Sequence, residues 1–216
     1  RSTAQVAEVA RRLREERIPC DALWYDIDYM DGYRVFTFDP ERFADITEHA
    51  TMLTEQGFHQ VAIVDPGIKA DPDGYAPYRE AVASDFVLTD PQGSPHVGHV
   101  WPGETVYPDF SSPAVRRWWG GLHQFYFERG ITGIWNDMNE PSDLTAGDHL
   151  CERGPTVPNT LVACDEGRGA TMAKIHNAYG MLHSKATVED GMLALRPSDR
   201  PFLLTRSCYC GAQKYA

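Results

Sequence analysis

The chain has 216 residues, of which 42% are hydrophobic and 24% charged, so it holds enough apolar material for one sizeable core. Its formal charge of −11 argues against nucleic acid or an anionic membrane surface as a partner. No apolar run approaches the roughly 20 residues of a membrane span, and the N-terminal stretch lacks the apolar region of a signal peptide.

In chain order, helices alternate with strands. Apolar residues at helical spacing mark the helices, and short apolar runs closed by Pro, Gly or Asp mark the strands. The predicted elements are a helix over 3–17, a strand over 22–29, a helix over 40–56 with Asp39 as its N-cap, a strand over 59–66, a helix over 112–129 that tolerates Gly120 and Gly121, a strand over 130–137, a helix over 171–192 and a strand over 201–207. Two long irregular stretches, 67–110 and 141–168, interrupt the series.

Alternation of this kind predicts parallel strands joined by helical crossovers. The strands become charged toward their carboxyl ends, at Asp26, Asp28, Asp65, Asp137 and Arg206. That end carries the functional site in barrels and in open α/β sheets, and no strand is followed by a dinucleotide or phosphate-binding glycine motif. We expect an α/β fold, a partial (β/α)8 TIM barrel of about four βα units with two long loops. Residues 1–216 would be an incomplete barrel domain, truncated at both ends.

The five cysteines bear on the compartment. Their number is odd and no CxxC pair is present, which favours free thiols, although a bridge between Cys151 and Cys164 is an alternative. Free thiols indicate a reducing environment, so we expect a cytoplasmic location. The oligomeric state is left open.

The stretch ITGIWNDMNEP, residues 131–141, is the strongest candidate for chemistry. Strand parity puts Trp135 and Asp137 on one face. A carboxylate beside an apolar wall suits glycoside hydrolysis, in which a retaining enzyme needs a nucleophile and an acid about 5–5.5 Å apart. The alternative is that Asp137 caps a loop or pairs with Arg206. Trp24, in the middle of its strand, is expected to be a packing residue.

The string WNDMNEP resembles the nucleophile signature of glycoside hydrolase family 31, the α-glucosidase and α-xylosidase family. Five further segments occur in the order expected of that family: LWYDIDYMDGYRVFTFDPERF, IVDPGI, VWPGETVYPDF, IHNAYGM and RPFLLTRSCYCGAQKYA. The similarity extends from about residue 18 to residue 216.

This resemblance implies that Asp137 is the catalytic nucleophile and that Glu140 supports it. The residues it implies for substrate binding are Asp26, Ile63, Trp101, Trp135, Met138 and Arg206. It places the general acid/base and a sugar-binding histidine beyond Ala216, so the 216 residues alone are expected to be inactive.

The implied activity is hydrolysis of terminal α-linked glucose from an α-glucoside or α-glucan, with retention and without cofactor or metal. One alternative is a non-catalytic carbohydrate-binding half-barrel, and another is an α-xylosidase or α-glucan lyase of the same family. A cation site at Asp28, Asp31 and Asp65 is a further alternative. Asp65 is expected instead to be a structural acid bonded to loop amides.

Overall fold

The computed structural model describes residues 2–145 and 155–216, and its centre is a parallel sheet of four strands. The strands are β1 (Ala22–Tyr25), β2 (His59–Val64), β6 (Gly133–Asn136) and β9 (Leu203–Thr205). They lie in the order β1-β2-β6-β9, so strands consecutive among these four are also neighbours in space. In the register, Val64 is opposite Asn136, which is opposite Thr205. The carboxyl ends of the strands therefore meet along one edge.

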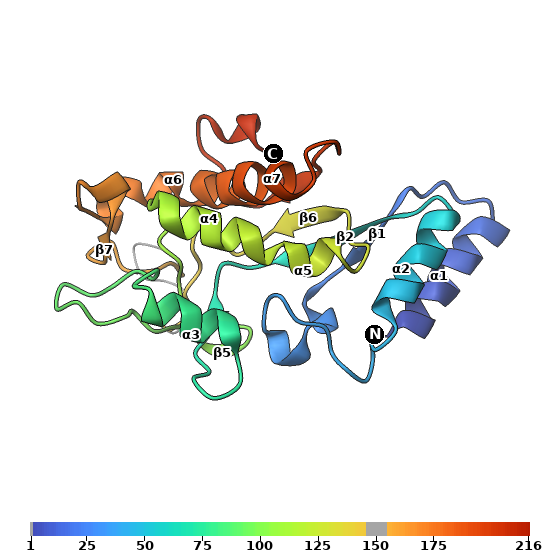
Figure 1. Cartoon of the computed structure of the whole chain (residues 1–216), viewed down its shortest axis with the longest axis horizontal. Coiled ribbons are helices and arrows are strands. Elements are labelled where there is room, and N and C mark those ends of the chain that lie inside the picture. The colour runs from blue at the N-terminus through green and yellow to red at the C-terminus, as the bar shows by residue number, and fades with distance from the viewer. Residues whose placement is uncertain (1, 146–154) are drawn as a thin grey trace.

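Helices connect the strands, as the alternation predicts. They are α1 (Thr3–Glu15), α2 (Ile46–Glu55), α4 (Pro113–Leu122), α5 (Gln124–Phe127), α6 (Met172–Lys185), the π-helix η4 (Ala186–Met192) and α7 (Leu193–Leu195). In Figure 1, α1 and α2 lie side by side at one end of the molecule, and α4 runs along the helical segment that contains α6 and α7. Buried aromatic side chains fill the space between these helices and the sheet, among them Trp119, Tyr126 and Tyr179.

The two stretches expected to be irregular contain short elements, so that expectation is wrong in part. Residues 67–110 include β3 (Ile68–Lys69), α3 (Ala76–Ala83), β4 (Gly98–Val100) and β5 (Gly103–Val106), and the three strands form an antiparallel sheet in the order β3-β5-β4. The second stretch contributes β7 (Val162–Ala163), which pairs with β8 (Ala170–Thr171). Strands of two to four residues are too short to show a period of two in the sequence.

Two predicted boundaries are also wrong, each because an aspartate caps a local turn. The first strand ends at Tyr25, since the Asp26 side chain accepts the Ile27 N–H at 2.8 Å and starts the 3-10 helix η1 (Ile27–Tyr29). The helix expected from residue 40 begins at Ile46. Asp39 does cap a turn there, because its Oδ1 accepts the Glu41 and Arg42 N–H groups.

The cysteines Cys20, Cys164, Cys208 and Cys210 are free thiols. Cys151 lies outside the described residues. No helix within the described ranges has the length and apolar character needed to span a membrane.

Candidate active site

A cavity of about 620 Å³ lies at the carboxyl ends of β1, β2 and β6. Its lining includes five of the predicted site residues: Asp26, Ile63, Trp101, Trp135 and Asp137. They come from three strand ends and from the turn between β4 and β5, so only the tertiary structure brings them together. The wall is apolar and aromatic and the polar groups are carboxylates, which suits a ring that carries hydroxyl groups.

Asp137 follows β6 directly, and its N–H donates to the Val64 carbonyl at 3.4 Å. Its side chain is 12% exposed and faces Arg206, whose Nε lies 3.3 Å from Oδ1. Burial raises the pKa of the Asp137 carboxyl above its usual value, and the Arg206 charge opposes that rise. The proposed pairing with Arg206 therefore exists, and it leaves Asp137 on the cavity wall.

Glu140 binds the same guanidinium more tightly. Arg206 donates from Nε to Glu140 Oε1 at 3.0 Å and from Nη2 to Oε2 at 2.5 Å. Ser142 Oγ also donates to Oε2, at 2.5 Å. Although burial raises the pKa of Glu140, these hydrogen bonds hold it below its usual value. Glu140 thus keeps Arg206 in place beside Asp137 rather than lining the cavity itself.

Met138 does not line the cavity either. Its side chain is buried, and its sulfur accepts from Arg206 Nη2 at 3.2 Å. The next residue, Asn139, ties the loop to β9, because its amide donates to Thr205 Oγ1 at 2.9 Å and its Oδ1 accepts the Ser207 N–H at 3.0 Å.

Asp65 was expected to be a structural acid bonded to loop amides, and the structure places it differently. It lies one position beyond the Val64–Asn136 pair, as Asp137 does on β6, so the two acids are neighbours across adjacent strands. Asp65 is 5% exposed, and within residues 2–145 and 155–216 its Oδ1 has no hydrogen-bond partner, loop amides included. Burial and the charge of Asp137 raise the pKa of Asp65 to about 7. It is therefore a buried acid of the site that carries a proton below neutral pH.

Sequence reasoning also misjudged Trp24, which was expected to be packed. Its side chain is 44% exposed, lines the same cavity and meets Trp135 edge-to-face at 6.1 Å between centroids. The signal available in the sequence was its spacing of two residues from Asp26, which directly follows β1. Ser142 was missed as well, although it directly follows the segment that suggested the nucleophile.

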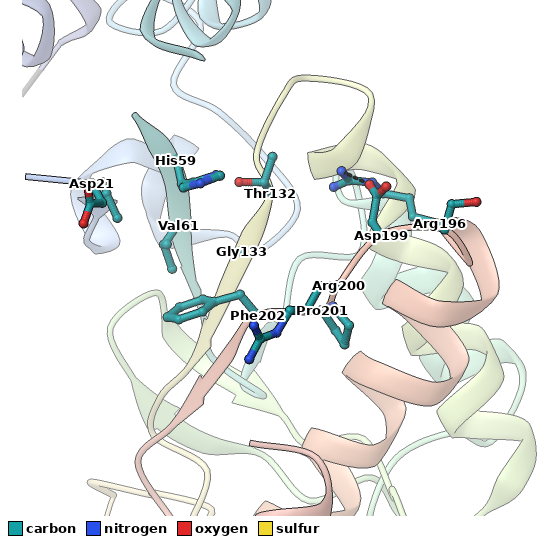
Figure 2. A pocket seen from close by; sticks show the side chains of 12 residues that line it. Asp21, His59, Val61, Thr132, Gly133, Arg196, Asp199, Arg200, Pro201 and Phe202 are labelled. Carbon is teal, nitrogen blue, oxygen red and sulfur yellow. Dashed lines mark ion pairs between the residues drawn. The ribbon is translucent and has the colours of Figure 1, made fainter. Parts of the chain in front are cut away.

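A second cavity, of about 740 Å³, lies at the opposite, amino ends of the strands. Figure 2 shows Phe202, Val61 and Gly133 along it, with the Arg196–Asp199 ion pair at its rim. It has no group of acids comparable to that at the carboxyl ends. Chemistry in barrel folds belongs to the carboxyl end, which leaves the first cavity as the candidate site.

Metal ligands are not gathered in the part of the chain that the structure describes. Within residues 2–145 and 155–216, no three His, Cys, Asp or Glu side chains lie together as a metal ion requires. This excludes a cation site built from Asp28, Asp31 and Asp65.

Acids and aromatic side chains that share a cavity at the carboxyl ends of parallel strands are the arrangement expected of the glycoside hydrolase class. Residues 1–216 match the model of the glycosyl hydrolases family 31 TIM-barrel domain, and the chain belongs to that family. The expected partial (β/α)8 barrel is thereby confirmed.

Several known α-glucosidases are similar to this chain in sequence or structure. The chain is 42% identical to alpha-glucosidase 2 of Bacillus thermoamyloliquefaciens over 98% of its own length and 26% of that protein. It is 34% identical to the lysosomal alpha-glucosidase of Mus musculus, covering all of this chain and 24% of the relative. A crystal structure of a glucosidase II alpha subunit superimposes with a TM-score of 0.87 at 32% identity, over 99% of this chain and 22% of that one. The chain thus spans about a quarter of these relatives.

Proposed function

We propose that the protein containing this chain is a retaining α-glucosidase that releases terminal α-linked glucose, with Asp137 as its nucleophile. The observation that carries the proposal is the position of Asp137, on the wall of the cavity between Trp135 and Arg206. The α-glucosidase relatives support the substrate class.

The geometry supports a double displacement. Asp137 would attack the anomeric carbon, forming a β-linked glycosyl-enzyme as the leaving group departs, and water would then release glucose with its α configuration retained. Arg206 favours the ionised nucleophile, and Glu140 holds Arg206 in place. Asp26, which is exposed in the cavity, is available to bind sugar hydroxyls, while Ile63 and Trp101 form apolar walls. Met138, whose sulfur accepts from Arg206, would help to position that guanidinium rather than contact the sugar.

The general acid/base stays a prediction, namely an aspartate beyond Ala216. We also propose that the 216 residues expressed alone turn over little substrate, because four strands supply only part of a wall that takes eight strands in a (β/α)8 barrel.

A fluoroglycoside that traps the glycosyl-enzyme tests the nucleophile directly. A 5-fluoro-α-glucosyl fluoride should add one sugar to the peptide that contains Asp137. Asp137→Asn should abolish labelling and reduce hydrolysis of an aryl α-glucoside by roughly 10⁴-fold or more, the order seen when a catalytic nucleophile is removed. Asp85→Asn is the matched control, since Asp85 is exposed and has a φ of 54° that asparagine tolerates.

Each alternative predicts a different result in this experiment. A carbohydrate-binding half-barrel would take no label. An α-xylosidase would prefer the aryl α-xyloside, and an α-glucan lyase would release an unsaturated sugar in place of glucose. Undiminished turnover by Asp137→Asn would refute the assignment.

The cytoplasmic location is a separate proposal that rests on the cysteine pattern alone. Fractionation of the source cells, with blotting for the protein, tests it.

A further inference from the structure

The carboxylate of Asp143 joins two segments that lie far apart in the sequence. Its side chain is 5% exposed. Oδ1 accepts the His99 N–H at 3.0 Å together with the N–H and the hydroxyl of Thr145, at 2.9 and 2.5 Å. Oδ2 lies 2.9 Å from His96 Nε2. Although burial raises its pKa, these hydrogen bonds hold the pKa of Asp143 well below its usual range. A buried carboxylate is costly unless it is hydrogen-bonded, so the four bonds to Asp143 mark a specific contact between the two segments.

Backbone contacts reinforce this junction. The Leu144 N–H donates to the His99 carbonyl at 2.8 Å, and Tyr107 Oη donates to the Ser142 carbonyl at 2.8 Å. A Cβ at Gly98 would lie 2.5 Å from Asp143 Oδ2, so the strand passes too close for any side chain at that position. β4 is the edge of the β3-β5-β4 sheet, and residues 143 and 144 satisfy both backbone groups of His99 on that edge.

Both joined segments carry residues of the candidate site. Trp101 is in the turn between β4 and β5, is 48% exposed and lines the cavity. On the other side, Ser142 immediately precedes Asp143 and accepts from Arg206 Nη2 at 2.9 Å, and Arg206 contacts Asp137. The Asp143 junction therefore lies between the tryptophan wall and the loop of the proposed nucleophile.

We propose that Asp143 is a positioning residue that fixes the β4–β5 hairpin, and with it Trp101, against the loop that carries Asp137. The inference rests on the proposed function for its effect on catalysis, but the anchoring itself does not. Misplacement of an apolar binding wall weakens the substrate complex, because preorganisation of the binding surface is lost even when the reacting groups are intact. An interaction made equally in the ground state and the transition state appears in KM and leaves kcat nearly unchanged.

Hydrogen exchange in the ligand-free natural protein tests the anchor without reference to activity. In Asp143→Ala, the amides of β4, above all that of His99, should exchange at least about 10-fold faster, because the Asp143 acceptor is lost. Asp143→Asn keeps one acceptor oxygen and should fall between the alanine variant and the wild type. Asp90→Asn is the matched control. It removes a carboxylate in the same segment, residues 67–110, that among the described residues accepts only from its own turn, at the Gln92 and Ser94 N–H groups. Unchanged exchange in Asp143→Ala would overturn the proposal.

Steady-state kinetics with an aryl α-glucoside tests the consequence. Asp143→Ala should raise KM about 10-fold and change kcat by less than about 3-fold, as Trp101→Ala should. The double variant should be no worse than Trp101→Ala, since both changes act through one side chain. A fall in kcat with KM unchanged would mean that Asp143 acts on the nucleophile loop, and would overturn the proposed role.

The outcomes separate this proposal from the proposed function. A wild-type protein that neither hydrolyses nor takes the fluoroglycoside label refutes the α-glucosidase assignment, while hydrogen exchange still decides the anchor. If Asp143→Ala does not fold, His96→Phe keeps a ring against Tyr107 but removes one of the four bonds to Asp143, and it should raise KM and the exchange of β4 about 2- to 3-fold. If this variant leaves both KM and the exchange of β4 unchanged, the proposal is likewise overturned.

Discussion

At the scale of single residues, the site places three acids around one cation. Arg206 contacts Asp137 and Glu140, and Asp65 lies on the neighbouring strand without a hydrogen bond to its Oδ1. One guanidinium cannot neutralise three neighbouring carboxylates, so Asp65, the most buried of them, keeps its proton to higher pH. Of the two acids beside Arg206, Asp137 is the one that lines the cavity, which is why it is the proposed nucleophile.

Replacing Asp65 by asparagine should therefore change stability in a pH-dependent manner. The pKa of Asp65 is raised to about 7 in the folded state, above its ordinary value of 3.8, so the native protein loses stability as pH rises between those values. Asparagine carries no charge at any pH. Asp65→Asn should resemble the wild type in free energy of unfolding at pH 4 and exceed it at pH 8. Urea unfolding at both pH values measures this, and an equal difference at the two would contradict a protonated Asp65.

At the scale of elements, α4 and η4 approach each other so closely that α4 requires a glycine at position 120. A Cβ at Gly120 would lie 2.3 Å from the carbonyl carbon of Asp190, whereas a Cβ at Gly121 would meet nothing within 4 Å. Thr187, also in η4, accepts from the Asn136 amide at 3.0 Å and so ties this helical segment to the sheet beneath the site. The sequence shows two adjacent glycines, but only the packing separates their roles.

Alanine at these two positions gives a matched pair of variants. Gly120→Ala should lower the free energy of unfolding by about 1–3 kcal/mol, because the added methyl group must displace the backbone of η4. Gly121→Ala should leave stability unchanged or raise it by roughly 0.5–1 kcal/mol, through the higher helix propensity of alanine. Denaturant midpoints measure both changes. Equal effects would show that α4 and η4 are not in close contact.

At the scale of the whole molecule, the helical layer encloses two histidines that have no access to solvent. Within the described residues, His123 Nδ1 donates to the Trp119 carbonyl at 2.9 Å and Nε2 has no partner. His183 stacks on Phe110 at 4.7 Å between centroids, and no described residue bonds to either of its ring nitrogens. Burial lowers the pKa of His123 to about 4 and holds that of His183 well below its usual value. Both must be neutral in the folded protein.

The protein should consequently lose stability in mild acid. Unfolded histidines take up protons below about pH 6.5, whereas folded His123 does so only near pH 4 and the pKa of folded His183 is also well below its usual value. The stabilisation present above pH 6.5 is therefore lost as the pH falls below that value. Asp65 titrates in the opposite sense, so the measurement belongs in the Asp65→Asn background. There, urea unfolding should show stability falling by a few kcal/mol from pH 7 to pH 4.5. His183→Phe, which keeps the stacking, should flatten that dependence, and an unaltered slope would contradict the interpretation.

The sequence by itself determined the alternation of helices and strands, the parallel sheet and the acids at its carboxyl edge, because periodicity and strand-end charge are local patterns. It could not show the three-stranded sheet within residues 67–110, whose strands are too short to be periodic. Nor could it show that Asp65 Oδ1 has no hydrogen-bond partner among the described residues, or that Trp24 lines the cavity. Only the tertiary structure decided which acids share Arg206 and that Asp143 joins the insertion to the loop of Asp137. Those contacts link residues 44 to 69 positions apart, and a pattern read along the chain carries no distance between them.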